Sequence, residues 1–106
     1  MQGDVVTADT LLPEMFRSEA HFHRKVETMA AARGWLSFHD RDSRKNVAGL
    51  PDLLLIRERL VWMELKYGRG KLNDDQKAFI AALRAAGQEV YVCWPGDLKL
   101  IEKVLA

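Results

Sequence analysis

Apolar residues recur with a helical period in two parts of the chain, one near its start and one in its second half. The first helix is expected to begin near Pro13, a residue tolerated in a first turn, and to end at Gly34, a typical C-terminal cap. Its apolar seam consists of Met15, Phe22, Val26, Met29 and Ala30. Two more helices are predicted over 74–87 and 95–106.

Shorter apolar runs between these helices predict four strands. One run is "WLSFH" (35–39) and another is "EVYVCW" (89–94). The other two lie in "GLPDLLLIRERLVWMELKYG" (49–68), where the charged break "RER" predicts the turn of a hairpin. The resulting order is α-β-β-β-α-β-α. It predicts the α/β class, with a hairpin, a strand–helix–strand crossover and a mixed central sheet flanked by helices.

Three ionisable residues interrupt the apolar strands of this hairpin. Asp52 opens the first strand, and Glu64 and Lys66 lie near the end of the second. Side chains alternate along a strand, so Glu64 and Lys66 share a face. If the hairpin is centred on Glu58, Asp52 faces Glu64 with Cβ atoms about 4.5–5.5 Å apart. Two carboxylates at that separation repel unless a divalent cation with oxygen ligands lies between them.

Two other interpretations of these charges stay open. A one-residue slip of the hairpin would move Glu64 and Lys66 to the opposite face of the sheet. A carboxylate at a strand end is also often solvated, and a Glu-x-Lys pair is often a surface ion pair that contributes little. Three such residues together in apolar strands favour a functional site.

The same residues resemble the signature of the PD-(D/E)XK nuclease superfamily, with "PD" at 51–52 and "ELK" at 64–66. A closer resemblance is to the VRR-NUC (virus-type replication-repair nuclease) family, in the blocks "GLPDLLLI", "MELK", "GKLNDDQKAF" and "LRAAGQEVYV". The resemblance extends over residues 18–95. It implies a restriction-endonuclease-like α-β-β-β-α-β core and metal-dependent hydrolysis of phosphodiester bonds, with Mg²⁺ or Mn²⁺ as the cofactor.

The resemblance also implies roles for individual residues. Asp52 and Glu64 would be metal ligands, assisted by the backbone carbonyl of Leu65. Lys66 would hold or polarise the attacking water, or offset charge on the phosphate. Gln76 would lie beside this lysine. Because Asn73 precedes it by three residues, a capping box is the competing explanation for Gln76, and both roles can hold at once.

A glutamate on the first helix is the last ligand that the resemblance implies. Glu19 fits, because its spacing places it in the apolar seam, where an acid needs a partner. The alternatives are that Ser18 caps the helix and Glu19 only favours its positive end, or that Glu27 is the ligand. The histidines show no metal-ligand spacing, so His23 is expected at the surface; the alternative is that it lines the cleft, one turn after Glu19.

Length and charge limit how the chain could bind a nucleic acid. Its 106 residues suit one domain, with 1–12 as an N-terminal arm and 13–106 as the nuclease domain. The net charge is only +1, so DNA would need a local basic patch. Loops on either side of the acidic pair supply basic residues suited to phosphate contacts, and solvated loop charge is the alternative. These residues are Arg41, Arg44, Lys45, Arg69 and Lys71.

The expected function is a DNA endonuclease, structure-specific for branched, junction or flap DNA. The alternatives are a nucleic-acid-binding module that does not cleave, and an interaction subunit with a structural metal. Cutting both strands of a junction suggests a homodimer, in which the apolar arm 1–12 or the hairpin edge packs on the partner. Cys93 is the single cysteine, which fits the reducing cytoplasm, and no apolar run approaches the roughly 18 residues of a membrane span.

Overall fold

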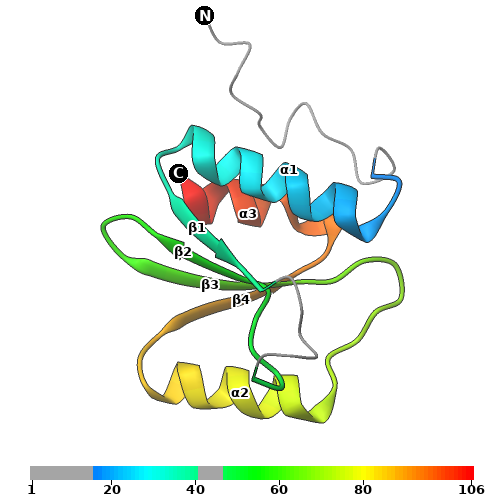
Figure 1. The fold of residues 1–106 in the computed structure, drawn as a ribbon, viewed down its shortest axis with the longest axis vertical. Coiled ribbons are helices and arrows are strands. Elements are labelled where there is room, and N and C mark those ends of the chain that lie inside the picture. Colours follow the sequence, from blue (N-terminus) through cyan, green and yellow to red (C-terminus); the bar gives the residue numbers. More distant parts are fainter. Residues whose placement is uncertain (1–15, 41–46) are drawn as a thin grey trace, which may run out of the picture.

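The computed structural model describes residues 16–40 and 47–106, which form a four-stranded sheet with helices on both faces (Figure 1). Helices α1 and α3 cover one face and α2 covers part of the other. The elements are α1 (Glu19–Ala32), β1 (Leu36–His39), β2 (Leu53–Ile56), β3 (Leu60–Leu65), α2 (Asp74–Ala85), β4 (Glu89–Cys93), the 3-10 helix η3 (Pro95–Asp97) and α3 (Leu98–Leu105). This confirms the predicted α/β class and element order. No helix in these two ranges is both long and apolar enough to cross a membrane.

Helix α1 begins at Glu19, so the prediction of a start near Pro13 was wrong for residues 16–18. The hydroxyl of Ser18 accepts a hydrogen bond from the His21 amide (3.1 Å) and caps the helix. Just before this cap, the ring of Phe16 is buried, and the hydroxyl of Tyr67 donates to the Phe16 carbonyl (2.6 Å). That long-range contact fixes the extended entry into the helix. Pro13 itself lies outside the described residues.

The sheet has the order β1-β2-β3-β4, with antiparallel pairs between β1, β2 and β3 and a parallel pair between β3 and β4. Leu54 lies opposite Trp62, and Ile56 lies opposite Leu60. This is the register of a hairpin centred on Glu58, so that prediction is confirmed. Continued past the last paired residues, the same register brings Asp52 opposite Glu64.

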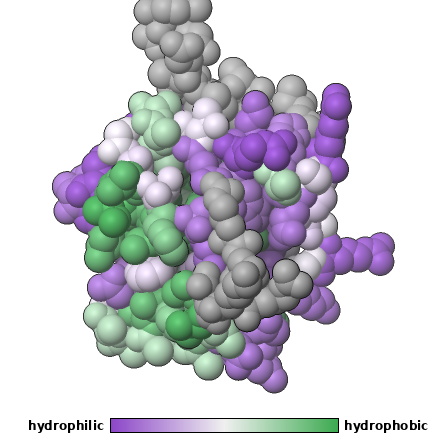
Figure 2. Space-filling view, in the orientation of Figure 1, coloured by the Kyte–Doolittle hydropathy of each residue, from purple (hydrophilic) through white to green (hydrophobic). Residues whose placement is uncertain are grey.

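The two faces of the sheet are buried to different extents. The face under α1 and α3 is closed by a core of Leu53, Leu55, Val61, Met63 and Leu65 from the strands. On the other face, α2 contributes only one fully buried side chain, Ile80. An apolar area therefore stays exposed over the hairpin end of the strands, at the left of Figure 2. Its largest side chains are Leu36, Ile56 and Leu60, and Phe38 is exposed further along β1.

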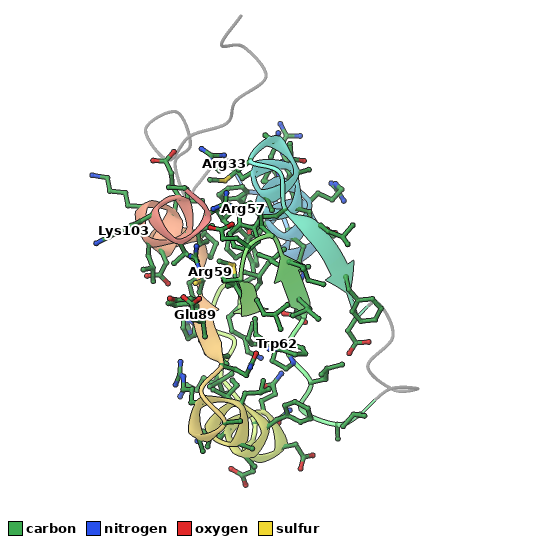
Figure 3. The ribbon with its side chains drawn as sticks, turned by 90° about the vertical axis from the view of Figure 1, so that its left-hand side faces the viewer. Arg33, Arg57, Arg59, Trp62, Glu89 and Lys103 are labelled. Atoms are coloured by element: carbon green, nitrogen blue, oxygen red, sulfur yellow. The ribbon has the colours of Figure 1, made fainter. Side chains whose placement is uncertain are left out.

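The charged break of the hairpin anchors the C-terminal helix (Figure 3). The guanidinium of Arg57 lies 4.5 Å from the ring centroid of Trp35 and donates to the Leu105 carbonyl (3.3 Å). Arg59 donates to the Val104 carbonyl (2.6 Å) and to Glu89 (2.8 Å). Carbonyls at a helix end lack intrahelical donors, so these arginines satisfy them and join α3 to the sheet.

Candidate active site

Asp52 and Glu64 are interlocked at the ends of the hairpin strands. The backbone amide of Asp52 donates to Glu64 Oε1 (3.2 Å), and the amide of Leu65 donates to Asp52 Oδ2 (2.9 Å). Glu64 is only 2% exposed, whereas Asp52 is half-buried. The backbone therefore holds two carboxylates side by side where β2 begins and β3 ends.

The electrostatics of this pair resist a second negative charge. Burial, and after it the charge of Asp52, raise the pKa of Glu64 from its usual value near 4.5 to about 7, while Lys66 opposes the shift. Such a carboxyl is stable when it holds a proton, or when a cation compensates both charges. The arrangement therefore favours the binding of a positive ion.

Lys66 and Gln76 complete a network around Glu64. Lys66 Nζ lies 3.4 Å from Glu64 Oε2 and donates to Gln76 Oε1 (3.0 Å). Gln76 Nε2 donates to the same carboxylate oxygen of Glu64 (3.1 Å). Gln76 is also the third residue of α2, and it forms a reciprocal capping box with Asn73. Gln76 thus both caps α2 and holds the side chains of Lys66 and Glu64.

A close backbone contact sets α2 against the loop that leads to Asp52. Gly49 has φ +86°, and a Cβ atom there would overlap the carbonyl group of Asp75 and lie 3.0 Å from the Gln76 nitrogen. Only glycine permits this approach. The contact fixes the distance between the strand end that carries Asp52 and the helix end that carries Gln76.

Glu19 does not lie in the apolar seam, so this prediction was wrong. Its side chain is 66% exposed in the first turn of α1, with its carboxylate 4.0 Å from His23 Nε2. Its spacing from Phe22 and Val26 is that of the buried face, but the helix begins at Glu19 and its first residues are exposed. The buried face of α1 consists of Phe22, His23, Val26, Met29 and Ala30.

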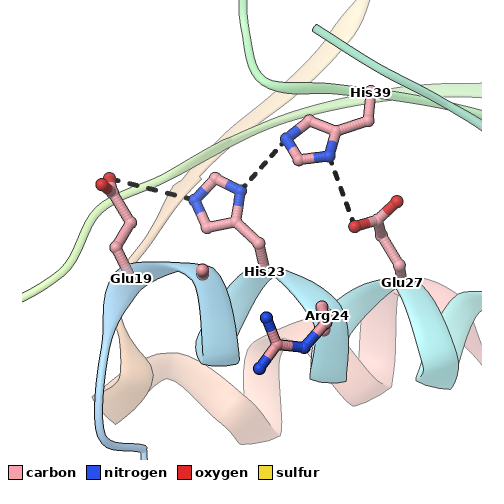
Figure 4. A pocket seen from close by; sticks show the side chains of 6 residues that line it. Glu19, His23, Arg24, Glu27 and His39 are labelled. Carbon is pink, nitrogen blue, oxygen red and sulfur yellow. Dashed lines mark hydrogen bonds and ion pairs between the residues drawn. The ribbon is translucent and has the colours of Figure 1, made fainter. Parts of the chain in front are cut away.

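His23 and His39 lie beside the site (Figure 4); for His23 the structure supports the cleft position that the sequence left as the alternative, whereas the place of His39 was not predicted. His23 is 8% exposed rather than at the surface, and its Nε2 lies 3.9 Å from Asp52 Oδ2. Its Nδ1 lies 3.4 Å from His39 Nε2, and His39 Nδ1 lies 3.4 Å from Glu27 Oε2. The spacing of His23, Val26 and Ala30 would have revealed the burial of His23.

The basic residues around the site are only partly described. Arg69 and Lys71 are exposed in the loop between β3 and α2, whereas Arg41, Arg44 and Lys45 lie outside the described residues. Two further arginines, Arg17 and Arg24, line a hollow at the start of α1. Sequence reasoning missed both, because Arg24 lies on α1 and Arg17 lies just before it, away from the loops beside the acidic pair.

The side chains at this site are of the types that bind a divalent cation, but they are not arranged around a common point. No His, Cys, Asp or Glu side chains within 16–40 and 47–106 already form a group of three around a possible ion. Two features nevertheless suit a cation: the raised pKa of Glu64, and the buried Nε2 of His23, which has no hydrogen-bond partner beside Asp52.

Comparison with known proteins gives two matches. The model of the VRR-NUC domain family matches residues 9–94 of the chain. A solved structure described as a VRR_NUC domain has a TM-score of 0.65 and 23% sequence identity, covering 82% of this chain and 92% of that chain. At this identity the second match shows a shared fold. No curated protein matches the chain.

Proposed function

This chain belongs to the VRR-NUC family of nucleases, and we propose that it is a metal-dependent endonuclease that hydrolyses phosphodiester bonds in DNA. The observation that carries the proposal is the network of Asp52, Glu64, Lys66 and Gln76 on one face of the sheet. The family match agrees with the resemblance seen in the sequence. Cleavage of branched, junction or flap DNA is the expected specificity.

Asp52 and Glu64 would hold a divalent ion, Mg²⁺ or Mn²⁺, assisted by the carbonyl of Leu65 and the carboxylate of Glu19. Such an ion stabilises charge on phosphate oxygens and lowers the pKa of a bound water. Gln76 orients the ammonium group of Lys66 beside Glu64. From there Lys66 can hydrogen-bond the attacking water or a phosphate oxygen.

The surroundings of the site suit contacts with a phosphate backbone. Arg69 and Lys71 are exposed on the loop that leads from Lys66 to α2, and Arg17 and Arg24 lie at the start of α1. Phosphate contacts position a nucleic acid without reading its sequence, which suits recognition by DNA shape. Arg41, Arg44 and Lys45 are proposed to add to these contacts.

The proposed activity predicts cleavage that depends on both metal and DNA structure. With Mg²⁺ or Mn²⁺, a branched DNA should be cut faster than a linear duplex of the same sequence, and excess EDTA should stop the reaction. Ca²⁺ should permit DNA binding with little cleavage, because its looser coordination orients water poorly. Gel analysis of labelled strands measures this. DNA binding without any product in Mg²⁺ or Mn²⁺ would instead favour the non-cleaving module.

We also propose that two copies associate through the exposed apolar area at the hairpin. Leu36, Ile56 and Leu60 lie side by side across three strands, and all three are exposed. A row of this kind on one sheet face is suited to a two-fold contact. The arm 1–12 is a further candidate, although it lies outside the described residues.

Light scattering should give a mass near twice the single-chain 12.1 kDa at micromolar concentration. Leu60→Arg should return the mass to that of one chain, because it places charge in the apolar row. Leu100→Arg is the matched control, since Leu60 and Leu100 are 42% and 41% exposed and Leu100 lies on α3. Equal effects of both substitutions would argue against this surface, as would a wild-type mass of one chain.

A further inference from the structure

The imidazole of His23 presents a buried nitrogen to the candidate metal site. Its Nε2 has no hydrogen-bond partner. It faces two carboxylate oxygens, Asp52 Oδ2 at 3.9 Å and Glu19 Oε1 at 4.0 Å. Both distances are too long for a hydrogen bond. A buried polar nitrogen without a partner is costly, so its retention beside two acids needs an explanation.

The contacts of the other ring nitrogen explain how His23 is oriented (Figure 4). Glu27 Oε2, 3.4 Å from His39 Nδ1, favours a proton on that nitrogen. In that tautomer His39 Nε2 is an acceptor, and His23 Nδ1 is the donor across the contact of 3.4 Å. This tautomer leaves the lone pair of His23 Nε2 directed at Asp52 and Glu19.

We propose that His23 Nε2 is a direct ligand of the divalent ion, together with Asp52 and Glu19. The inference rests on the proposed function, and it adds a nitrogen donor to a site otherwise made of oxygens. Two donors of one ion stand about 3–4 Å apart when each bond is about 2.1 Å, so the gaps on either side of Nε2 match an ion between the groups.

The surroundings of His23 meet a further requirement of a metal ligand. A ligating imidazole usually donates its second nitrogen to an oriented acceptor, and His39, held by Glu27, provides that acceptor. A cavity of about 250 Å³ lies against the ring and is lined by Glu19, Ala20, His23, Arg24, Glu27 and His39.

A nitrogen ligand changes which ion the site prefers. Imidazole is a better ligand for transition metal ions, whereas Mg²⁺ prefers oxygen. The site should therefore bind Mn²⁺ more tightly than Mg²⁺, and His23 should be responsible for much of the difference.

Electron spin-echo envelope modulation of bound Mn²⁺ tests the ligand directly, without any cleavage assay. Wild-type protein should show modulation from a coordinated ¹⁴N nucleus, and labelling histidine with ¹⁵N should change its frequencies. His23→Gln should remove the modulation and lower Mn²⁺ affinity about tenfold, with a smaller change for Mg²⁺. His21 lies on the same helix, but its Nδ1 accepts a hydrogen bond from the Arg17 amide. His21→Gln should therefore change neither the ¹⁴N modulation nor the affinity for Mn²⁺.

The outcomes separate this inference from the proposed function. Mn²⁺ that binds the wild type and is lost in Asp52→Asn, yet shows no ¹⁴N modulation, would overturn the role of His23 alone. Modulation that persists in His23→Gln would do the same. Failure of Mn²⁺ to bind the wild type at all would overturn the metal site and with it the proposed function. The wild-type spectrum decides the matter even if His23→Gln does not fold.

Discussion

Glu64→Gln is expected to lower kcat/KM for DNA cleavage about 1000-fold, and to raise the stability of the metal-free protein above pH 7. The amide oxygen of the variant can still accept from the Asp52 amide, which Glu64 Oε1 does at 3.2 Å. The substitution removes the negative charge that would hold a divalent ion. Asp52→Asn should reduce cleavage to a similar extent for the same reason.

The stability effect follows from the raised pKa of Glu64, about 7 in the folded protein against about 4.5 when exposed. Between these two pH values the folded state binds more protons than the unfolded state, so the free energy of unfolding falls as pH rises. The contribution of protonated Glu64 to the free energy of unfolding is fully present below pH 4.5 and is lost as the pH rises through 7. A shift of one pKa unit corresponds to about 1.4 kcal/mol, and solvent screening reduces the total for this shift. We therefore expect the free energy of unfolding to fall by about 2 kcal/mol.

Denaturant unfolding of the wild type and Glu64→Gln from pH 4 to pH 8, with EDTA present, measures this difference. The two proteins should diverge as pH rises, with the variant the more stable at pH 8. Adding Mn²⁺ should then stabilise the wild type and leave the variant nearly unchanged, because only a site that binds the ion gains from it. A variant less stable than the wild type at pH 8 would mean that Glu64 serves mainly to hold the fold.

The central pair could be predicted from the sequence because local constraints determine it. Asp52 and Glu64 face one another once the hairpin is centred on Glu58, a register that the sequence suggested, with a one-residue slip left open, and that the structure confirms. The dual role of Gln76 was equally accessible. Its spacing from Asn73 is a capping signal, and the strand end nearby holds Lys66.

The rest of the site depends on contacts between residues far apart in the chain. Helix α1 begins only after its cap at Ser18, partly through the bond between Tyr67 and Phe16, so Glu19 lies in an exposed first turn although its spacing is that of the buried face. Where this helix begins depends on a contact with a residue far along the chain, and the spacing within the helix does not indicate it. The link between His23 and His39 joins a helix to a strand, and no spacing along the chain indicates it.

The arginines of the hairpin turn show the same limit. In the sequence, "RER" predicts a polar turn, and the turn is where it was expected. Its second function depends on α3, which lies more than forty residues later and whose last carbonyls accept from Arg57 and Arg59. Periodicity identifies elements and faces, whereas such contacts require the packed structure.

Gly49 offers a test of how strictly the fold positions the site. The loop before Asp52 lies against the first turn of α2, and the missing side chain of Gly49 is what permits the contact with the carbonyl group of Asp75. Gly87 has nearly the same backbone angle, φ +83° against φ +86°, but an added Cβ there would meet nothing within 4 Å. The two glycines therefore separate the cost of the backbone angle from the cost of the close approach.

Gly87→Ala should cost about 1 kcal/mol, the usual penalty for a side chain at positive φ. Gly49→Ala should cost about 3 kcal/mol, because the loop must also move away from α2. Thermal unfolding should show the larger loss for Gly49→Ala. Cleavage measured well below the melting temperature should also fall about 100-fold in this variant alone, since a displacement of about 1 Å between Asp52 and Gln76 misplaces the reacting groups. Equal stability and full activity in both variants would mean that the contact between this loop and α2 does not position the site.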